Sequence, residues 1–199
     1  MDEGCIKFNC EWIKDKPLSI DKLVEINNWR DKLYALKLIG AYDNGIGFGN
    51  ISKRFEKNTF IITGSATGNL HYLNKNHYVL VNKYNLAKNS LTCKGPIKAS
   101  SESLSHAIIY ECSSDTNAVI HIHNIHIWKK FIYKLPTTNK DIPYGTPEMA
   151  KEIKQLFTKS NVNLEKIIVM GGHKEGIISF GKDLEEAGNT LLSKFNIIN

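Results

Sequence analysis

Residues 119–124 read VIHIHN, a run of branched apolar residues interrupted by two histidines one residue apart. A short apolar run of this kind is typical of a buried β-strand. Side chains alternate across a strand, so His121 and His123 point to one face while Ile120 and Ile122 point to the other. Two imidazoles on one face can bind a metal ion when other parts of the chain supply further ligands. We therefore expect a buried strand that carries part of a metal site.

The composition is that of an ordinary globular protein. The 199 residues are 42% hydrophobic and 23% charged, so we expect one domain over residues 1–199, with residues 1–18 as an N-terminal arm. No apolar run approaches the roughly 20 residues that span a bilayer. The first residues, MDEGCIKFNCEW, are acidic where a secretory signal is basic. We expect no membrane partner and a cytoplasmic location.

The formal net charge of +6 is compatible with nucleic acid or with an anionic small molecule as the partner. The lysines are scattered, with no dense basic block and no nucleic-acid-binding motif, so we predict that the chain does not bind nucleic acid. The four cysteines show no CxxC spacing and are interpreted as free thiols. They are Cys5, Cys10, Cys93 and Cys112.

The pattern along the chain predicts an α/β fold with helices and mostly antiparallel strands. Helices are expected within residues 17–45, 96–115, 146–161 and 183–198. Their predicted N-caps are Ser19, Ser100 or Ser101, Thr146 and Asp183. Strands are expected at 6–14, at the end of 43–55, and within 58–68, 77–83, 90–95 and 117–124, and residues 166–181 read as a β-hairpin.

A catalytic metal site needs a third ligand and an open coordination position. His173 is the strongest candidate for the third ligand, because it follows an apolar strand and two glycines that allow a close approach of the backbone. Taken alone, a histidine at this place is usually a polar tip at the end of a sheet. His126 is the weaker candidate, since it falls in the turn after the strand.

Several segments are suited to an anion such as phosphate. A serine cap at Ser100 or Ser101 leaves free backbone N–H groups at the positive end of a helix dipole. In this first turn, Glu102 is placed to move a proton on a bound substrate, with His106 one turn further along the same face. The glycine-rich loop 63–69 can cradle phosphate with its amides, and the loop at 47–54 adds Asn50 with Ser52, Lys53 and Arg54. Each feature also has an ordinary structural explanation, and the combination carries the prediction.

The order GNIS, TGSATG, SSE, HIH and a later histidine before a glycine-rich hairpin resembles the class II aldolase/adducin family. Within this family the chain is most similar to the L-fuculose-1-phosphate aldolase branch, and the resemblance runs from about residue 22 to residue 193. It implies a central, mostly antiparallel sheet of about nine strands flanked by helices. It also implies a homotetramer with active sites at the subunit interfaces.

The resemblance further implies the roles of particular residues. His121, His123 and His173 would bind one Zn²⁺ ion per chain, with another divalent metal as the alternative, and Glu102 would be the catalytic acid and base. The substrate, a small sugar phosphate, would be held through its phosphate group. The residues matching that phosphate site are Asn50, Thr67 with Gly68, Ser100 and Ser101, and Thr63 with Gly64 is the alternative to Thr67 with Gly68.

Two departures from the family pattern bear on the reaction. Residues 124–142 are much shorter than the aldolase segment that carries a proton-donating tyrosine, and Tyr133 or Tyr144 is the available substitute. The hairpin after His173 is two residues longer than usual. The leading hypothesis is a lyase that splits a phosphorylated ketose into dihydroxyacetone phosphate and an aldehyde. The alternatives are a dehydratase of the methylthioribulose-1-phosphate type and a non-catalytic, adducin-like interaction domain; a 4-epimerase is less favoured, because such enzymes tend to have Asp at the position of Glu102.

Overall fold

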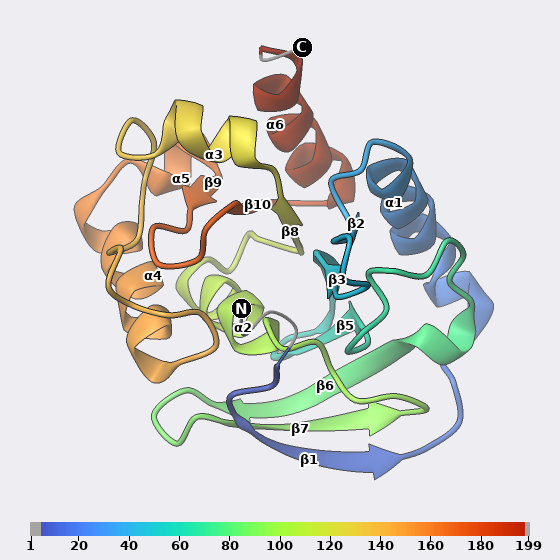
Figure 1. Cartoon of the computed structure of the whole chain (residues 1–199). Coiled ribbons are helices and arrows are strands. Elements are labelled where there is room, and N and C mark those ends of the chain that lie inside the picture. Colours follow the sequence, from blue (N-terminus) through green and yellow to red (C-terminus); the bar gives the residue numbers. More distant parts are fainter. Residues whose placement is uncertain (1–4, 198–199) are drawn as a thin grey trace.

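A curved sheet of eight strands runs through the whole molecule (Figure 1). The computed structural model describes residues 5–197. The order across the sheet is β1 (Asn9–Lys14), β7 (Ser90–Gly95), β6 (Tyr78–Asn85), β5 (Thr59–Thr63), β4 (Asn50–Glu56), β8 (Ala118–His123), β10 (Gly176–Gly181) and β9 (Ile167–Val169). Only the pair β1–β7 is parallel among these strands. The predicted antiparallel sheet is confirmed, with eight strands where about nine were expected.

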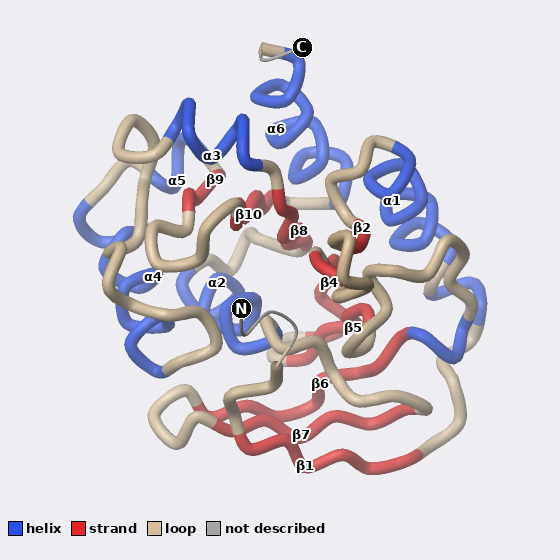
Figure 2. Tube along the Cα trace, viewed as in Figure 1, coloured by secondary structure: helices blue, strands red, loops and turns tan. Residues whose placement is uncertain are grey.

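Two strands lie outside the main sheet and helices cover both of its faces (Figure 2). The short strands β2 (Gly40–Ala41) and β3 (Gly47–Phe48) pair with each other. One helical layer contains α1 (Val24–Ala35), α3 (Ile125–Phe131) and α6 (Leu184–Asn196), and the other contains α2 (Ser103–Cys112), α4 (Pro147–Lys159) and α5 (Val162–Glu165). The single-turn helices η1 (Ile20–Lys22) and η2 (Lys75–His77) complete the described elements.

Strand β8 lies inside the sheet, between β4 and β10, and all six of its residues are buried. Ile120 and Ile122 belong to the hydrophobic cluster that contains α1 and α6. Val119 belongs to the cluster on the other face, with α2 and α4. The alternation predicted from VIHIHN is therefore confirmed, and it directs His121 and His123 toward the α2 face.

The first residues of the observed helices can be compared directly with the predicted N-cap residues. Thr146 accepts a hydrogen bond from the Met149 N–H, and Asp183 accepts one from Glu186, so both predicted caps are confirmed. The predicted cap of α2 is wrong by one or two residues, because Glu102 occupies the N-cap position. Residues 100–102 form a turn before the helix, in which the Ser100 carbonyl accepts bonds from both the N–H and the hydroxyl of Ser103.

Two other helical predictions differ from the structure. The helix expected within 17–45 is confined to α1, and it stops where Lys37 takes a left-handed conformation (φ 57°) that turns Leu38 into the core. Ser19 precedes η1 without a side-chain capping bond. Helix α3 was not predicted; the Asn124 side chain caps it by accepting bonds from the N–H groups of residues 126 and 127. The hairpin predicted at 166–181 is present as β9 and β10.

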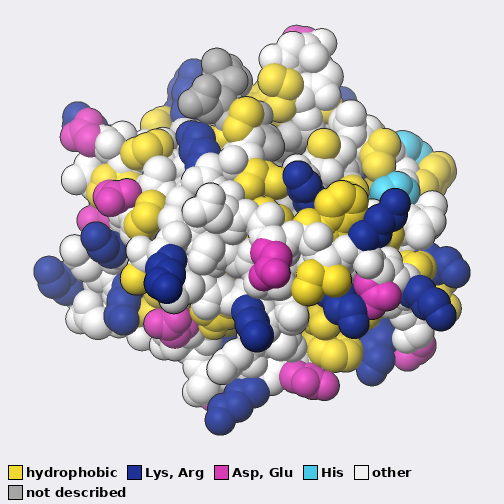
Figure 3. Space-filling model, turned by 90° about the horizontal axis from the view of Figure 1, so that it is seen from below, with side chains coloured by type: hydrophobic (Ala, Val, Ile, Leu, Met, Phe, Trp, Pro, Cys, Tyr) yellow, Lys and Arg dark blue, Asp and Glu magenta, His cyan; other side chains and the backbone are white. Residues whose placement is uncertain are grey.

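The surface over β1, β6 and β7 carries lysine and arginine side chains spread among acidic and apolar ones (Figure 3). Within residues 5–197, no helix has the length and apolar character needed to cross a membrane. The predicted arm is an edge strand over its part from Asn9 to Lys14, and residues 1–4 lie outside the described part of the chain.

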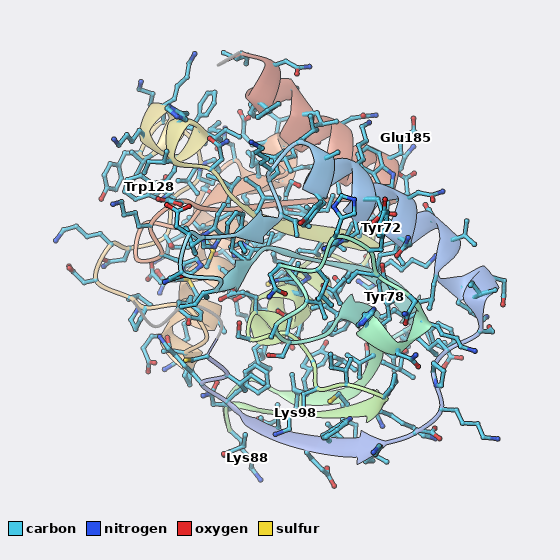
Figure 4. All side chains as sticks on the ribbon, turned by 45° about the vertical axis from the view of Figure 1, so that its right-hand side comes forward. Tyr72, Tyr78, Lys88, Lys98, Trp128 and Glu185 are labelled. Atoms are coloured by element: carbon cyan, nitrogen blue, oxygen red, sulfur yellow. The ribbon has the colours of Figure 1, made fainter. Side chains whose placement is uncertain are left out.

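Helix α6 packs closely on α1 through Gly188, and this contact gives a stability prediction. A Cβ at Gly188 would lie 2.1 Å from the ring of Trp29, so Gly188→Ala forces the indole to move. Overpacking of this kind costs about 1–3 kcal/mol and outweighs the roughly 1 kcal/mol gained in helix propensity. We expect a lower urea midpoint for Gly188→Ala. Glu185→Ala on the exposed side of α6 (Figure 4) should leave the midpoint nearly unchanged, and equal midpoints for the two variants would contradict the packing argument.

Candidate functional site

Three histidine side chains meet at one end of β8. The Nε2 atom of His123 lies 3.1 Å from Nε2 of His121 and 2.9 Å from Nε2 of His173. The exposed fractions are 1% for His121, 3% for His123 and 5% for His173. These three residues form the group of potential metal ligands found among the described residues. The structure thus brings together the set that the sequence analysis named.

The other ring nitrogen of two of these histidines is held by a hydrogen bond. His121 donates its Nδ1–H to the Ile177 carbonyl at 3.2 Å, which leaves a lone pair on Nε2. Nδ1 of His123 lies 2.6 Å from the Tyr42 hydroxyl, and that hydroxyl donates to Glu175 at 3.4 Å. Contacts of this type orient metal-binding imidazoles and fix their tautomer.

Burial keeps the three imidazoles in the neutral form that binds metal. Desolvation lowers the pKa of His121 to about 4. Desolvation also lowers the pKa of His123 and His173 well below the ordinary value, and the nearby His121 adds to both shifts. Lone pairs on neutral imidazoles are the donors that zinc and similar ions use.

The spacing of the nitrogens fits a metal ion. Zinc binds imidazole nitrogen at roughly 2.0–2.1 Å, and tetrahedral geometry then separates neighbouring nitrogens by about 3.3 Å. The observed separations of 3.1 and 2.9 Å are close to this value. Three buried nitrogen lone pairs that converge without protons between them would repel one another, and a cation removes that repulsion. The residues present therefore fit the ion that the resemblance implies.

His173 is positioned by a tight turn between β9 and β10. A Cβ at Gly171 would lie 2.1 Å from the Thr138 carbonyl oxygen, and one at Gly172 would lie 1.9 Å from the Ile142 carbonyl oxygen. The close backbone approach predicted for the two glycines is therefore present. The Trp128 indole (Figure 4) donates to the Met170 carbonyl at 2.8 Å and ties the same turn to α3.

A small hollow beside the histidines collects the predicted phosphate residues. Its lining is Gly47, Phe48, Gly49, Asn50, Gly64, Ser65, Ala66, Thr67, Gly68, Ser100, Ser101 and Glu102. Of the predicted set, only Thr63 is not part of this lining; its hydroxyl accepts a bond from the Ile51 N–H. Asn50 connects the hollow to the histidines because it is paired with His121 across β4 and β8. Its Oδ1 is buried and has no hydrogen-bond partner among the described residues.

The volumes of the surface hollows alone would suggest a different position for the functional site. A much larger surface hollow, of about 1350 Å³, lies along β1, β6 and β7 and contains none of the three histidines. Its lining is dominated by lysines, asparagines and strand residues without a convergent set of buried polar groups. We therefore place the site at the histidines, where buried donors and acceptors converge.

Glu102 is the charged side chain in the lining of the small hollow. It is 2% exposed and accepts a hydrogen bond from the Ser105 hydroxyl at 2.8 Å. Behind it, His106 is fully buried and its Nδ1 lies 2.7 Å from the Ser52 hydroxyl, which also contacts the Tyr110 hydroxyl. Desolvation, followed by the effect of His121, lowers the pKa of His106 well below its usual value. His106 is thus a neutral, buried neighbour of the site, whereas Glu102 faces the hollow.

Arg30 was not identified from the sequence, although it holds the loop of the hollow from behind. It is 1% exposed and its guanidinium donates to the carbonyls of residues 67, 68, 70 and 71. Because these carbonyl groups point toward Arg30, the opposite side of the loop is left for the backbone N–H groups of the loop. Arg30 lies on α1, about 40 residues before the loop, and no local pattern connects the two.

The structure separates the remaining candidates. His126 is exposed on α3 and is not part of the histidine cluster. Tyr133 is 68% exposed, whereas Tyr144 is 5% exposed and its ring centroid lies 4.4 Å from that of His173. Tyr144 is therefore the tyrosine that lies against the site. Tyr42 was missed because its loop gave no signal of a contact with His123.

The fold and the site define an α/β protein with a candidate three-histidine metal centre beside a small hollow that is lined mainly by small and polar residues. The chain matches the family described as Class II Aldolase and Adducin N-terminal domain over residues 41–193, which is more than half of its length. It therefore belongs to the class II aldolase and adducin family. A search of curated protein sequences finds no significant match.

Solved structures show the same fold at low sequence identity. An L-fuculose 1-phosphate aldolase is 20% identical with a TM-score of 0.68, over 92% of this chain and 84% of that chain. A sugar-phosphate aldolase from Thermotoga maritima is 16% identical with a TM-score of 0.66, over 89% and 91%. YgbL from Klebsiella pneumoniae, a putative aldolase/epimerase/decarboxylase, is 17% identical with a TM-score of 0.64, over 91% and 90%.

The buried histidines predict a pH dependence of stability in the metal-free protein. Their folded-state pKa values lie below the unfolded value near 6.5, so the unfolded chain binds more protons as the pH falls. Stability should therefore be full above about pH 6.5 and decrease toward pH 4, by up to about 1.4 kcal/mol per pH unit for each titrating histidine. Urea unfolding in chelator at pH 7, 6 and 5 measures this. His121→Gln should have a shallower slope, and equal slopes would contradict the prediction.

Proposed function

We propose that this chain is a metal-dependent lyase of the class II aldolase type that acts on a small phosphorylated ketose. In this proposal the products are dihydroxyacetone phosphate and an aldehyde, and the metal is Zn²⁺, one ion per chain. The observation that carries the proposal is the convergence of three buried Nε2 atoms beside a hollow lined by serine, threonine and glycine residues. A homotetramer with sites at subunit interfaces is part of the same proposal.

The residues of this chain would have three tasks: binding the metal ion, binding the phosphate group and transferring a proton. His121, His123 and His173 would hold the ion, which when bound supplies Lewis-acid polarisation of substrate oxygens. Asn50 and the amide and hydroxyl groups of the hollow would bind the phosphate and fix the orientation of the substrate. Thr67 and Gly68 lie in this lining, and Thr63 lies just behind it.

Glu102 is the group that would move the proton. Its carboxylate lines the hollow that would hold the phosphorylated end of the substrate, and the Ser105 hydroxyl holds one of its oxygens. In cleavage, the carboxylate would take the proton of the substrate hydroxyl that becomes the aldehyde carbonyl as the carbon–carbon bond breaks, and it would then deliver that proton to the carbon left behind. The buried surroundings exclude water that would otherwise compete for that proton.

The same residues would also serve a dehydratase, because a carboxylate and a Lewis acid can remove water from a related substrate. The masses of the products separate the two reactions, since cleavage gives two fragments and dehydration gives one product lighter by water. An adducin-like interaction domain would need none of the convergent lone pairs at the histidines. Their presence favours an enzyme over such a domain.

Metal content is the first test. We expect about one divalent ion per chain in protein purified without chelator or histidine tag, measured by mass spectrometry of the digested sample. His173→Ala should lose the ion, because two imidazoles alone hold it weakly. His126→Ala is the matched control and should keep it, since His126 is exposed on α3. An ion-free protein after reconstitution with zinc, cobalt or manganese would contradict the proposed centre.

The role of Glu102 is tested by Glu102→Gln on whichever phosphorylated ketose the product-mass screen identifies. The amide keeps the size of the side chain but cannot accept a proton, so kcat should fall by roughly 10²–10⁴-fold. Metal content should remain at the level of the unaltered protein. Glu111→Gln, on the exposed end of the same helix, is the control and should retain activity. Full turnover by Glu102→Gln would remove Glu102 from the mechanism.

A further inference from the structure

The short strands β2 and β3 and the loop between them pack on the histidine centre from one side. The backbone before β2 is bonded to the end of β8, because the His123 N–H donates to the Leu38 carbonyl at 3.2 Å (Figure 1). The Phe48 ring of β3 stacks on the His123 imidazole, with 5.3 Å between the centroids and 21° between the planes. The Tyr42 ring packs in turn on Phe48, with a centroid separation of 4.8 Å. His123 is therefore held by an aromatic ring on its face and by the Tyr42 hydroxyl at its edge.

The Tyr42 hydroxyl joins this imidazole to a carboxylate. It lies 2.6 Å from Nδ1 of His123 and donates its proton to Oε2 of Glu175 at 3.4 Å. A hydroxyl has a single proton, so Tyr42 accepts the Nδ1–H of His123 when it donates to Glu175. Nε2 of His123 then keeps its lone pair, and this is the nitrogen that faces His121 and His173. The carboxylate thereby favours the tautomer of His123 that can bind a metal ion.

The opposite tautomer shows what the carboxylate prevents. If Tyr42 donated its proton to Nδ1, the proton of neutral His123 would lie on Nε2, which could then not bind an ion. A negative charge beside the hydroxyl makes that arrangement less favourable, because the hydroxyl proton is attracted to the carboxylate. The distance of 3.4 Å is at the long end for a hydrogen bond, so we expect an effect of moderate size.

Glu175 is placed for this contact by the turn that also carries His173. It is half-buried and adopts a left-handed conformation (φ 73°), which is unfavourable for a residue with a Cβ atom. Its carbonyl accepts a bond from the Asn124 N–H at 3.0 Å, and the Gly176 N–H donates to the His173 carbonyl at 2.9 Å. Backbone strain of this kind is concentrated at functional sites. One fixed turn therefore supplies an imidazole of the centre and the carboxylate that acts on a second imidazole.

We propose that Glu175 is a positioning residue of the metal centre. Through the Tyr42 hydroxyl, its carboxylate keeps the proton of His123 on Nδ1 and so raises the affinity of the three histidines for a divalent cation. This role deepens the proposed function and rests on its metal centre, but not on the choice between cleavage and dehydration. None of the motifs that carry the family resemblance contains Tyr42 or Glu175. The two residues are 133 positions apart in the sequence, so only the fold brings them together.

The test is the affinity of the full chain for Zn²⁺, measured by competition with a chromophoric chelator. Tyr42→Phe removes the hydroxyl and keeps the ring, and we expect about 10–100-fold weaker binding, as for the loss of an outer partner of a metal-binding histidine. Glu175→Gln keeps the size of the side chain and removes the charge, and it should weaken binding by about three- to tenfold. Glu185→Gln makes the same change of charge on the exposed side of α6 (Figure 4) and should bind zinc as the unaltered chain does.

A double variant and a measurement of the tautomer separate positioning from a purely structural contact. If Glu175 acts through Tyr42, the variant with both Tyr42→Phe and Glu175→Gln should bind zinc as Tyr42→Phe alone does. In the metal-free chain, the nitrogen chemical shifts of the imidazoles should report Nδ1–H for His123. Tyr42→Phe should raise the fraction of His123 with the proton on Nε2. The urea midpoint of Glu175→Gln in chelator should stay close to that of the unaltered chain.

The outcomes separate this role from the proposed function. Zinc affinities of Tyr42→Phe and Glu175→Gln equal to that of the unaltered chain would overturn the role of Glu175 and leave the metal centre standing. Losses that multiply in the double variant, or an equal loss in Glu185→Gln, would also overturn it, because Glu175 would then act by another route or through net charge alone. Failure of the unaltered chain to bind zinc would overturn the centre and this role with it. Zinc affinities as expected, without turnover of phosphorylated ketoses, would contradict the lyase and support the role of Glu175. If Tyr42→Phe is poorly folded by urea titration, Glu175→Gln against Glu185→Gln decides the matter.

Discussion

The register of β8 between β4 and β10 is the constraint on which the site depends. It pairs Asn50 with His121 on one side and Gly176 with His123 on the other. Side chains alternate along a strand, so a slip of one residue would direct both imidazoles into the α1–α6 layer and would bring isoleucines into the polar site. Both layers are close-packed, and neither arrangement could be exchanged without exposing apolar groups or stranding polar ones. The hydrophobic pattern that folds the sheet therefore also aims the histidines.

The polar groups of the site can be buried because further residues around them satisfy and orient them through hydrogen bonds. The imidazoles of His121 and His123 are oriented by a carbonyl of β10 and by Tyr42, and the loop at residues 67–71 is oriented by Arg30. Ile177 lies on β10 and Arg30 lies on α1, whereas Tyr42 lies in the short loop between β2 and β3. Two of the three supporting groups are therefore fixed by regular secondary structure. The neutral state of the histidines follows from the same burial, since desolvation is the main cause of their lowered pKa values. The exclusion of water thus keeps the three histidines neutral and also keeps the polar hollow beside them buried.

The parts of this arrangement that sequence could predict are those encoded locally. Period-two alternation predicted the faces of β8, and the oxygen-bearing side chains of Thr146 and Asp183 predicted where two helices begin. The order of short motifs then predicted which loops would gather at the site. Arg30 and Tyr42 could not be found in this way, because their partners lie about 40 and 81 residues away and a lone Arg or Tyr has no pattern. The start of α2 was misplaced because a serine-rich turn and a serine cap look alike in sequence.

The short segment 124–142 has a structural consequence that its length alone did not reveal. Part of it forms α3, and the rest packs its backbone directly on Gly171 and Gly172, so that any side chain at either glycine would collide with a carbonyl oxygen. The turn that carries His173 is thereby held from the outside by the same short segment. The following residues bring Tyr144 onto the His173 ring, and Lys7 then covers Tyr144. Here the short course of the chain after α3 places Tyr144 against the ring of His173, so one segment both holds the turn that carries His173 and covers its imidazole.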